Sequence, residues 1–159
     1  MRRMLPLLLI SALGLAQTPE ERAVRALLDD WHSAAAQADE GRYFGHLAEE
    51  AVFLGTDATE RWDKRAFQTF AHPYFAKGKA WSFQATRRTI AFAANNKVAY
   101  FEEDLATPNL GPARGSGVLE NRQGVWKLLQ YNLSVPIPNP LMDDFRDRIA
   151  KHLASGAKH

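Results

Sequence analysis

The period of the hydrophobic positions changes near the middle of the chain. Up to about residue 80, apolar side chains recur every three or four positions, as in helices that lay one face on a core. Beyond that point they alternate with polar side chains, as in half-buried strands. Because the helices precede the strands, the pattern predicts an α+β fold with helices on one face of a sheet.

Two helices are expected before residue 50. The first begins at Thr18 and Pro19, because threonine caps helices and proline suits their first turn. The second is short, and Asp39 can cap it. Four apolar residues are expected to share its buried face: Tyr43, Phe44, Leu47 and Ala48.

A short strand, a third helix and four longer strands are expected next. The short strand covers residues 51–54, and the helix begins near Asp63. Pro73 should end or kink this helix, because a proline ring clashes with the preceding turn. The four strands are joined by short turns, so they should pair as an antiparallel meander. They cover residues 80–93, 97–106, 114–122 and 125–135.

The last twenty residues predict an amphipathic helix. Asn139 can cap it, Pro140 suits its first turn, and Gly156 can end it. We expect its apolar stripe to be buried, either on the domain or on a second subunit, and the second case is a homodimer. The stripe has one residue every four positions: Leu141, Phe145, Ile149 and Leu153.

The N-terminus has the order of a secretory signal peptide. Arg2 and Arg3 precede an apolar run that is too short to span a membrane, and Gly14-Leu15-Ala16 supplies the small residues of a cleavage site. We therefore predict a secreted or periplasmic protein without a membrane anchor after cleavage. The chain then divides into a signal peptide, a domain, and a C-terminal helix with its tail: residues 1–16, 17–139 and 140–159.

Charge and motif content argue against several functions. The chain has 20 basic and 18 acidic side chains, and loss of Arg2 and Arg3 would make the two numbers equal. A neutral domain without a basic cluster offers nothing that attracts nucleic acid or an anionic membrane. The sequence has no cysteine, no glycine-rich phosphate loop and no histidine pair at metal-ligand spacing. We therefore predict no disulfide, no cofactor and no metal site.

The stretch from Phe53 to Trp62 is the richest in chemistry. Its apolar start followed by Gly55 indicates a strand that stops at the surface of the core. Polar side chains beyond the glycine should therefore lie at a rim, where they can bind a ligand or relay protons. The candidates are Asp57, Glu60, Arg61 and Trp62, although the two carboxylates could instead stabilise the loop and the following helix.

Alternation in the strand near residue 100 directs one carboxylate inward. Phe101, Glu103 and Leu105 share a face, so Glu103 should enter the core with its apolar neighbours. Burial would raise the pKa of its carboxyl group unless Arg61 or Arg114 pairs with it. Such a buried pair can equally be a purely structural feature.

The chain resembles the SnoaL-like domain of the third type, within the nuclear transport factor 2-like superfamily. The resemblance covers about residues 20–139 and implies a cone: three helices packed in a strongly curved mixed or antiparallel sheet, with a pocket inside and commonly a dimer. Activity is mostly unassigned in this family. The resemblance rests on four motifs: Asp30-Trp31-His32, the stretch from Phe53 to Trp62, Arg114-Gly115-Ser116-Gly117-Val118-Leu119 and Trp126-Lys127-Leu128-Leu129-Gln130-Tyr131-Asn132-Leu133-Ser134.

One hypothesis is a binding module. The cone would hold a small apolar or amphipathic molecule and fix its polar end with Arg61, Arg114 and Glu103. Trp31 and Trp62 are further candidates for contact, although tryptophans of such a domain commonly belong to the core. Tyr131 and Asn132 point to opposite faces of their strand, so at most one of them lines the cavity, and we favour Tyr131.

The other hypothesis is a cofactor-free isomerase, cyclase or hydratase. His32, Asp57 and Glu103 are the candidates for an acid–base pair, while Tyr131 would donate to a developing oxyanion. His32 could instead be a core histidine with a satisfied hydrogen bond. Ketosteroid isomerases carry their base at the strand end near Gly55, where this chain has no carboxylate. In a third interpretation the domain serves in assembly and its cavity is incidental.

Overall fold

A computed structural model describes residues 17–156 of the chain, so the predicted signal peptide lies outside the described residues. No helix in this part is long and apolar enough to cross a membrane. The helices and strands are α1 (Pro19–Ala36), α2 (Glu40–Gly45), β1 (Leu47–Leu54), β2 (Arg61–Asp63), α3 (Lys64–Ala76), β3 (Gln84–Phe92), β4 (Val98–Ala106), β5 (Ala113–Arg122), β6 (Val125–Ser134) and α4 (Met142–Ala154), with short 3₁₀ turns η1 (Ala94–Asn96) and η2 (Asn139–Leu141).

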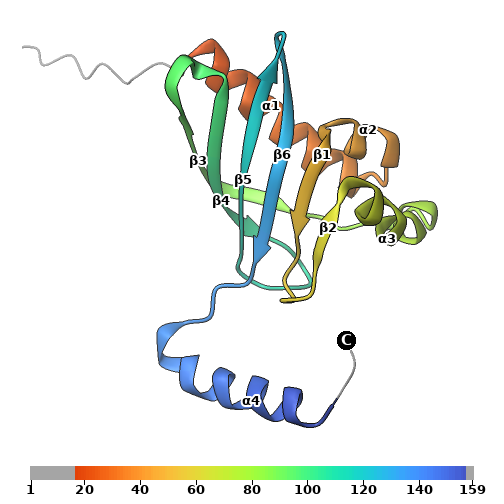
Figure 1. The fold of residues 1–159 in the computed structure, drawn as a ribbon, viewed down its shortest axis with the longest axis vertical. Helices are drawn as coiled ribbons and strands as arrows, with labels where there is room; N and C mark the ends of the chain where they lie inside the picture. Colours follow the sequence, from red (N-terminus) through yellow and green to blue (C-terminus); the bar gives the residue numbers. More distant parts are fainter. Residues whose placement is uncertain (1–16, 157–159) are drawn as a thin grey trace, which may run out of the picture.

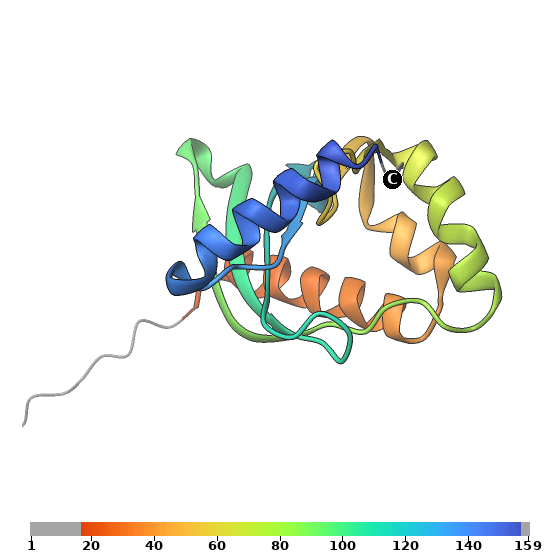
Figure 2. The ribbon, with the colours of Figure 1, turned by 90° about the horizontal axis from the view of Figure 1, so that it is seen from below.

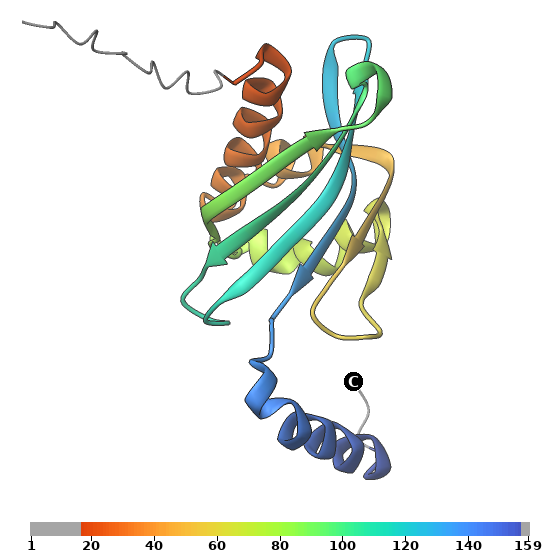
Figure 3. The same cartoon turned by 90° about the vertical axis from the view of Figure 1, so that its left-hand side faces the viewer.

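One curved sheet contains the six strands in the order β2-β1-β6-β5-β4-β3 (Figure 1). β3 to β6 form the expected antiparallel meander, because short turns connect them. β1 pairs in parallel with β6 and antiparallel with β2, which makes the sheet mixed. The predicted α+β class and curved sheet are confirmed, and Figure 3 shows the strands bending across the molecule.

The helices lie where the sequence places their apolar stripes. α1 runs along one face of the sheet, and α2 and α3 gather at the end where β1 and β2 lie (Figure 2). Thr18 caps α1 as expected, because its hydroxyl accepts a hydrogen bond from the Glu21 amide. Asp39 and Asp63 cap α2 and α3 in the same way.

One expected boundary in the first half is wrong, and of the two outcomes expected at Pro73, an end of the helix is excluded. Leu47 and Ala48 belong to β1 and not to a helix, because pairing of β1 with β6 begins at Leu47. Pro73 does not end α3, which continues to Ala76. The exposed side of α3 tolerates the proline since the carbonyl that it leaves unbonded can reach water, while Phe75 still packs on the core.

The strands β2 and β3 also differ from expectation, because strand pairing in the sheet decides where each of them begins and ends. β2 has three residues, too few to show an alternating pattern, and the turn after Gly55 folds it back on β1. The strand expected from residue 80 begins at Gln84. Trp81 and Phe83 lie in the segment before β3 and pack against the core. The apolar residues of this segment therefore reflect core packing and not sheet pairing.

The C-terminal helix stands apart from the domain (Figures 1 and 3). It begins after η2, and Asn139 makes no capping hydrogen bond, contrary to expectation. None of the residues in α4 is buried. Leu141, Phe145, Ile149 and Leu153 are between 40% and 61% exposed, so the stripe is not covered by its own domain.

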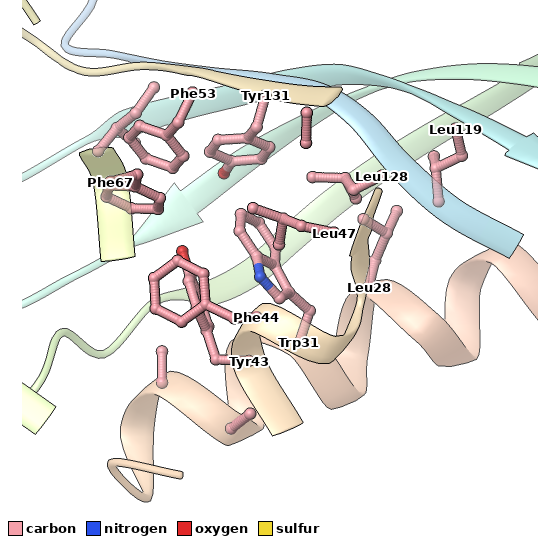
Figure 4. Packing of buried hydrophobic residues seen from close by; sticks show 14 of the residues in the cluster. Leu28, Trp31, Tyr43, Phe44, Leu47, Phe53, Phe67, Leu119, Leu128 and Tyr131 are labelled. Carbon is pink, nitrogen blue, oxygen red and sulfur yellow. The ribbon is translucent and has the colours of Figure 1, made fainter. Parts of the chain in front are cut away.

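Aromatic rings fill the space between α1 and the sheet (Figure 4). Trp31 stacks on Tyr43 with ring centroids 4.9 Å apart and meets Tyr131 edge-on at 4.6 Å. Phe53 stacks on Phe67 at 4.0 Å. The depth of the cone is therefore solid, and a cavity is left at its open end.

Candidate functional site

Glu103 is fully buried, as alternation in β4 predicted. Its Oε2 accepts a hydrogen bond from Arg88 Nε at 2.7 Å. Its Oε1 lies 2.7 Å from His32 Nε2 and accepts a hydrogen bond from the Tyr131 hydroxyl at 3.2 Å. Three side chains from α1, β3 and β6 thus converge on one carboxylate, and we name these four residues the Glu103 cluster.

The surroundings of Glu103 keep it ionised. Burial alone raises the pKa of its carboxyl group, but the hydrogen bonds and charges of His32 and Arg88 outweigh burial, so the pKa lies below its ordinary value. Because a carboxylate only accepts hydrogen bonds, His32 Nε2 carries a hydrogen. Burial and the neighbouring Glu103 charge raise the pKa of Tyr131 well above its ordinary value, so its hydroxyl remains a donor.

The arginine that pairs with Glu103 is Arg88, and not Arg61 or Arg114 as the sequence analysis expected. Its side chain is 3% exposed, and it also donates to Asp29 Oδ1 at 2.7 Å and to the Arg25 carbonyl at 3.3 Å. Burial lowers the pKa of Arg88, but the charges and hydrogen bonds of Glu103 and Asp29 raise it further, to a value above the ordinary one.

Gly115 makes room for the Glu103 cluster from the neighbouring strand. It pairs with Glu103 in the β4–β5 ladder and with Leu133 in the β5–β6 ladder. A Cβ at this position would overlap the Tyr131 hydroxyl and come within 2.9 Å of Glu103 Oε1. The backbone of Gly115 therefore lies closer to the polar atoms of Tyr131 and Glu103 than a residue with a side chain could at this position.

A cavity of about 170 Å³ opens at the end of the cone, and we name it the mouth pocket. The turn between β1 and β2, the buried side of α3 and the segment before β3 form most of its wall. Six of its lining residues are aromatic: Phe53, Trp62, Phe67, Phe70, Trp81 and Phe83. The others are Gly55, Thr56, Glu60, Leu110 and Leu133.

The turn after β1 places Glu60 in this wall. The Gly55 amide donates to the Glu60 carbonyl at 2.9 Å, and the Asp57 amide donates to Glu60 Oε2 at 3.1 Å. A Cβ at position 55 would overlap Glu60 Oε2, so the carboxylate folds over the glycine. Asp57 does not line the pocket, and its Oδ1 accepts from the amide and hydroxyl of Thr59 at 2.8 and 2.6 Å.

Two phenylalanines lie between the mouth pocket and the Glu103 cluster. Phe83 lines the pocket, and its ring centroid is 6.3 Å from that of His32. Phe53 lines the pocket and stacks on Tyr131 at 5.5 Å. The polar residues of the cluster do not line the pocket themselves. A molecule in the pocket would therefore be one ring away from the buried histidine.

The predicted site residues thus fall into three places. His32, Glu103 and Tyr131 meet in the Glu103 cluster, next to Trp31, which is a core residue with 1% exposure. Glu60 and Trp62 line the mouth pocket. Asp57, Arg61, Arg114 and Asn132 reach neither site: Arg61 is exposed, Arg114 faces Asp104 at 3.8 Å, and Asn132 lies opposite Ser116 on the other face of the sheet from Tyr131.

Sequence reasoning missed Arg88, and among the six pocket aromatics it selected only Trp62 as a candidate site residue. The signal for Arg88 was available in the hairpin register, since it lies directly opposite Glu103 across the turn at Asn95 and Asn96. The described residues contain no group of three or more histidine, aspartate or glutamate side chains that could hold a metal ion.

A family model described as a SnoaL-like domain matches residues 24–138. No curated protein matches the sequence. The match extends from α1 to the end of the sheet, so it includes both the Glu103 cluster and the mouth pocket.

Solved structures with the same fold come from several bacteria. An NTF2-like protein of unknown function from Pseudomonas putida has 15% identity and a TM-score of 0.64, over 77% of this chain and 91% of that one. A Nostoc punctiforme protein with a cystatin-like fold has 15% identity and a TM-score of 0.62, over 80% and 99%. A Novosphingobium aromaticivorans protein, provisionally assigned as a scytalone dehydratase, has 11% identity and a TM-score of 0.63, over 74% and 85%.

Proposed function

The chain belongs to the SnoaL-like domain family, and from this premise we propose that it binds a small, mainly apolar molecule in the mouth pocket. One observation carries the proposal: six aromatic side chains surround a cavity that the packing of the core leaves open. Ligand sites are concave and mostly apolar, with few polar groups to orient the ligand, and this pocket has that composition.

The size of the pocket limits the ligand. A dry apolar cavity of about 150 Å³ accepts benzene, and drug-sized ligands need roughly 300 Å³ or more. At about 170 Å³ the mouth pocket suits a molecule of one ring or a compact branched group. A larger ligand would have to extend out of the pocket into solvent, since the cone is filled behind Phe53 and Phe67.

Calorimetric titration with phenol and with 2-naphthol tests this proposal. Phenol should bind and 2-naphthol should bind more weakly, because the second ring does not fit. Phe70→Ala should weaken phenol binding several-fold, since Phe70 forms part of the wall and is 41% exposed, so its loss costs little stability. Tyr100→Ala is the control, since Tyr100 is an aromatic residue of β4 that is 52% exposed and lies outside the pocket wall. Equal effects of the two substitutions would contradict the proposal.

Acid–base catalysis is a second candidate, favoured by the 2.7 Å contact between His32 and Glu103. A histidine held by a buried carboxylate can exchange protons through its other ring nitrogen, and Tyr131 supplies a donor beside it. The binding function does not need His32. His32→Ala should therefore leave phenol affinity unchanged, whereas any turnover of a carbonyl substrate should be lost if His32 is the base.

Assembly and export complete the proposal. We propose a homodimer in which a second copy covers the exposed stripe of α4, because such a stripe is seldom left in water. We also propose that residues 1–16 direct the chain to the secretory pathway and are removed, on the order of their basic, apolar and small residues. Intact-mass measurement of the exported protein should give a chain that begins at Gln17.

A further inference from the structure

Resting on the proposed binding function, we infer that the ligand of the mouth pocket is a small organic cation carrying an alkylated or quaternary ammonium group. Among the described residues that line the pocket, Glu60 is the one ionisable residue. The described part of the chain contributes no lysine, arginine or histidine to that lining. The arginines that the sequence offered as partners for the polar end of a ligand, Arg61 and Arg114, lie outside it.

The aromatic wall suits a cation. The face of an aromatic ring carries partial negative charge and attracts a cation within about 6 Å of its centroid, tryptophan most strongly. Trp62 and Trp81 both line the pocket. Trp62 stacks on Phe70 with centroids 4.8 Å apart, and Trp81 stacks on Phe67 at 5.8 Å. The wall is therefore a continuous aromatic surface contributed by β2, α3 and the segment before β3.

The position of Glu60 gives this surface a net charge. Asp57 donates its amide to Oε2, and the residues that the structure describes donate no hydrogen bond to Oε1. The carboxylate is held against Gly55, so it cannot swing away from the turn without losing that hydrogen bond. A half-buried carboxylate beside apolar walls repels an anionic ligand and attracts a cationic one.

Size and charge then agree on one class of ligand. A trimethylammonium group is about as large as a single ring, is weakly hydrated because its charge is spread over methyl groups, and can leave water for an aromatic wall. A primary ammonium would need several hydrogen-bond acceptors, and Glu60 is the main acceptor in the lining.

Choline and its neutral isostere 3,3-dimethylbutan-1-ol separate charge from shape. In calorimetric titrations of the full-length mature protein, choline should bind at least tenfold more tightly than the alcohol. Glu60→Gln should lower choline affinity at least tenfold and alcohol affinity far less, because the amide oxygen can still accept from Asp57 while the charge is lost. Glu102→Gln, on the other face of the sheet, is the control and should change neither affinity.

A second variant keeps the carboxylate but moves it. Gly55→Ala should weaken choline binding more than alcohol binding, since the added methyl group displaces the Glu60 side chain from its place in the wall. Equal affinity of the wild-type protein for choline and the alcohol, or choline affinity that survives Glu60→Gln, would overturn the inference and leave a neutral apolar pocket. Failure of choline, the alcohol and phenol to bind at all would defeat the proposed function itself.

Discussion

Replacing Glu103 by glutamine should destabilise the domain strongly, although the two side chains have nearly the same shape. Glu103 is fully buried and accepts hydrogen bonds from Arg88, His32 and Tyr131. The amide group of glutamine would turn a donor toward at least one of these donors. It would also leave the Arg88 guanidinium, 3% exposed, with Asp29 as its remaining charged partner.

Removing one partner of a buried ion pair costs about 3–5 kcal/mol, and we expect about 3 kcal/mol because Arg88 retains Asp29. Domains of this size are stable by about 5–15 kcal/mol, so the loss is a large fraction of the total. Urea unfolding followed by tryptophan fluorescence and far-UV circular dichroism measures the free energy of unfolding of each variant.

Glu102→Gln is the matched control for Glu103→Gln. Glu102 is the preceding residue of β4, it is exposed, and it points to the opposite face of the sheet. Its substitution should change the free energy of unfolding by no more than about 0.5 kcal/mol. If Glu103→Gln falls within about 1 kcal/mol of the wild type, the buried carboxylate does not organise the interior and the reasoning above is wrong.

Three further predictions concern stability and assembly. Gly115→Ala should cost about 1–3 kcal/mol by overpacking against Tyr131 and Glu103, whereas Gly45→Ala, with open space around its Cβ, should be neutral or stabilising in the same urea titration. The pKa of Glu103 is lower in the folded state than in the unfolded chain, so its ionisation contributes to the free energy of unfolding. This contribution is complete above about pH 4.3 and is lost as the pH falls through the folded-state pKa. Urea midpoints from pH 6 to pH 3 should therefore fall more steeply for the wild type than for Glu103→Gln, and parallel curves would contradict this. Ending the chain after Pro138 should give a monomer in analytical ultracentrifugation, because the exposed stripe of α4 is then removed, whereas a persistent dimer would place the interface elsewhere.

Much of the fold could be predicted because local signals and tertiary packing agree. The caps Thr18, Asp39 and Asp63 each mark a helix start, and alternation in β4 correctly places Glu103 inside. Local signals failed where long-range contacts decide the structure. Leu47 fits a helical stripe, but pairing with β6 draws it into a strand, and Pro73 is tolerated because α3 is held by its buried face.

The candidate site was harder to predict because its residues come from different parts of the chain. His32, Arg88, Glu103 and Tyr131 lie on four elements, and only the hairpin register brings Arg88 opposite Glu103. Glu60 was expected at a rim and does line the pocket, whereas its neighbour Arg61 points into solvent. Which of two adjacent rim residues faces inward depends on the pairing of β2 with β1, and three residues are too few to reveal that pairing.

The indole N–H signals of the tryptophans test the mouth pocket most directly. The chain has four tryptophans, of which Trp62 and Trp81 line the pocket, while Trp126 packs against Phe92 at a ring distance of 5.9 Å. During titration of ¹⁵N-labelled protein with choline or phenol, the signals of Trp62 and Trp81 should shift together and saturate, while that of Trp126 stays in place. Saturable binding that moves Trp126 and leaves Trp62 and Trp81 unchanged would contradict the account.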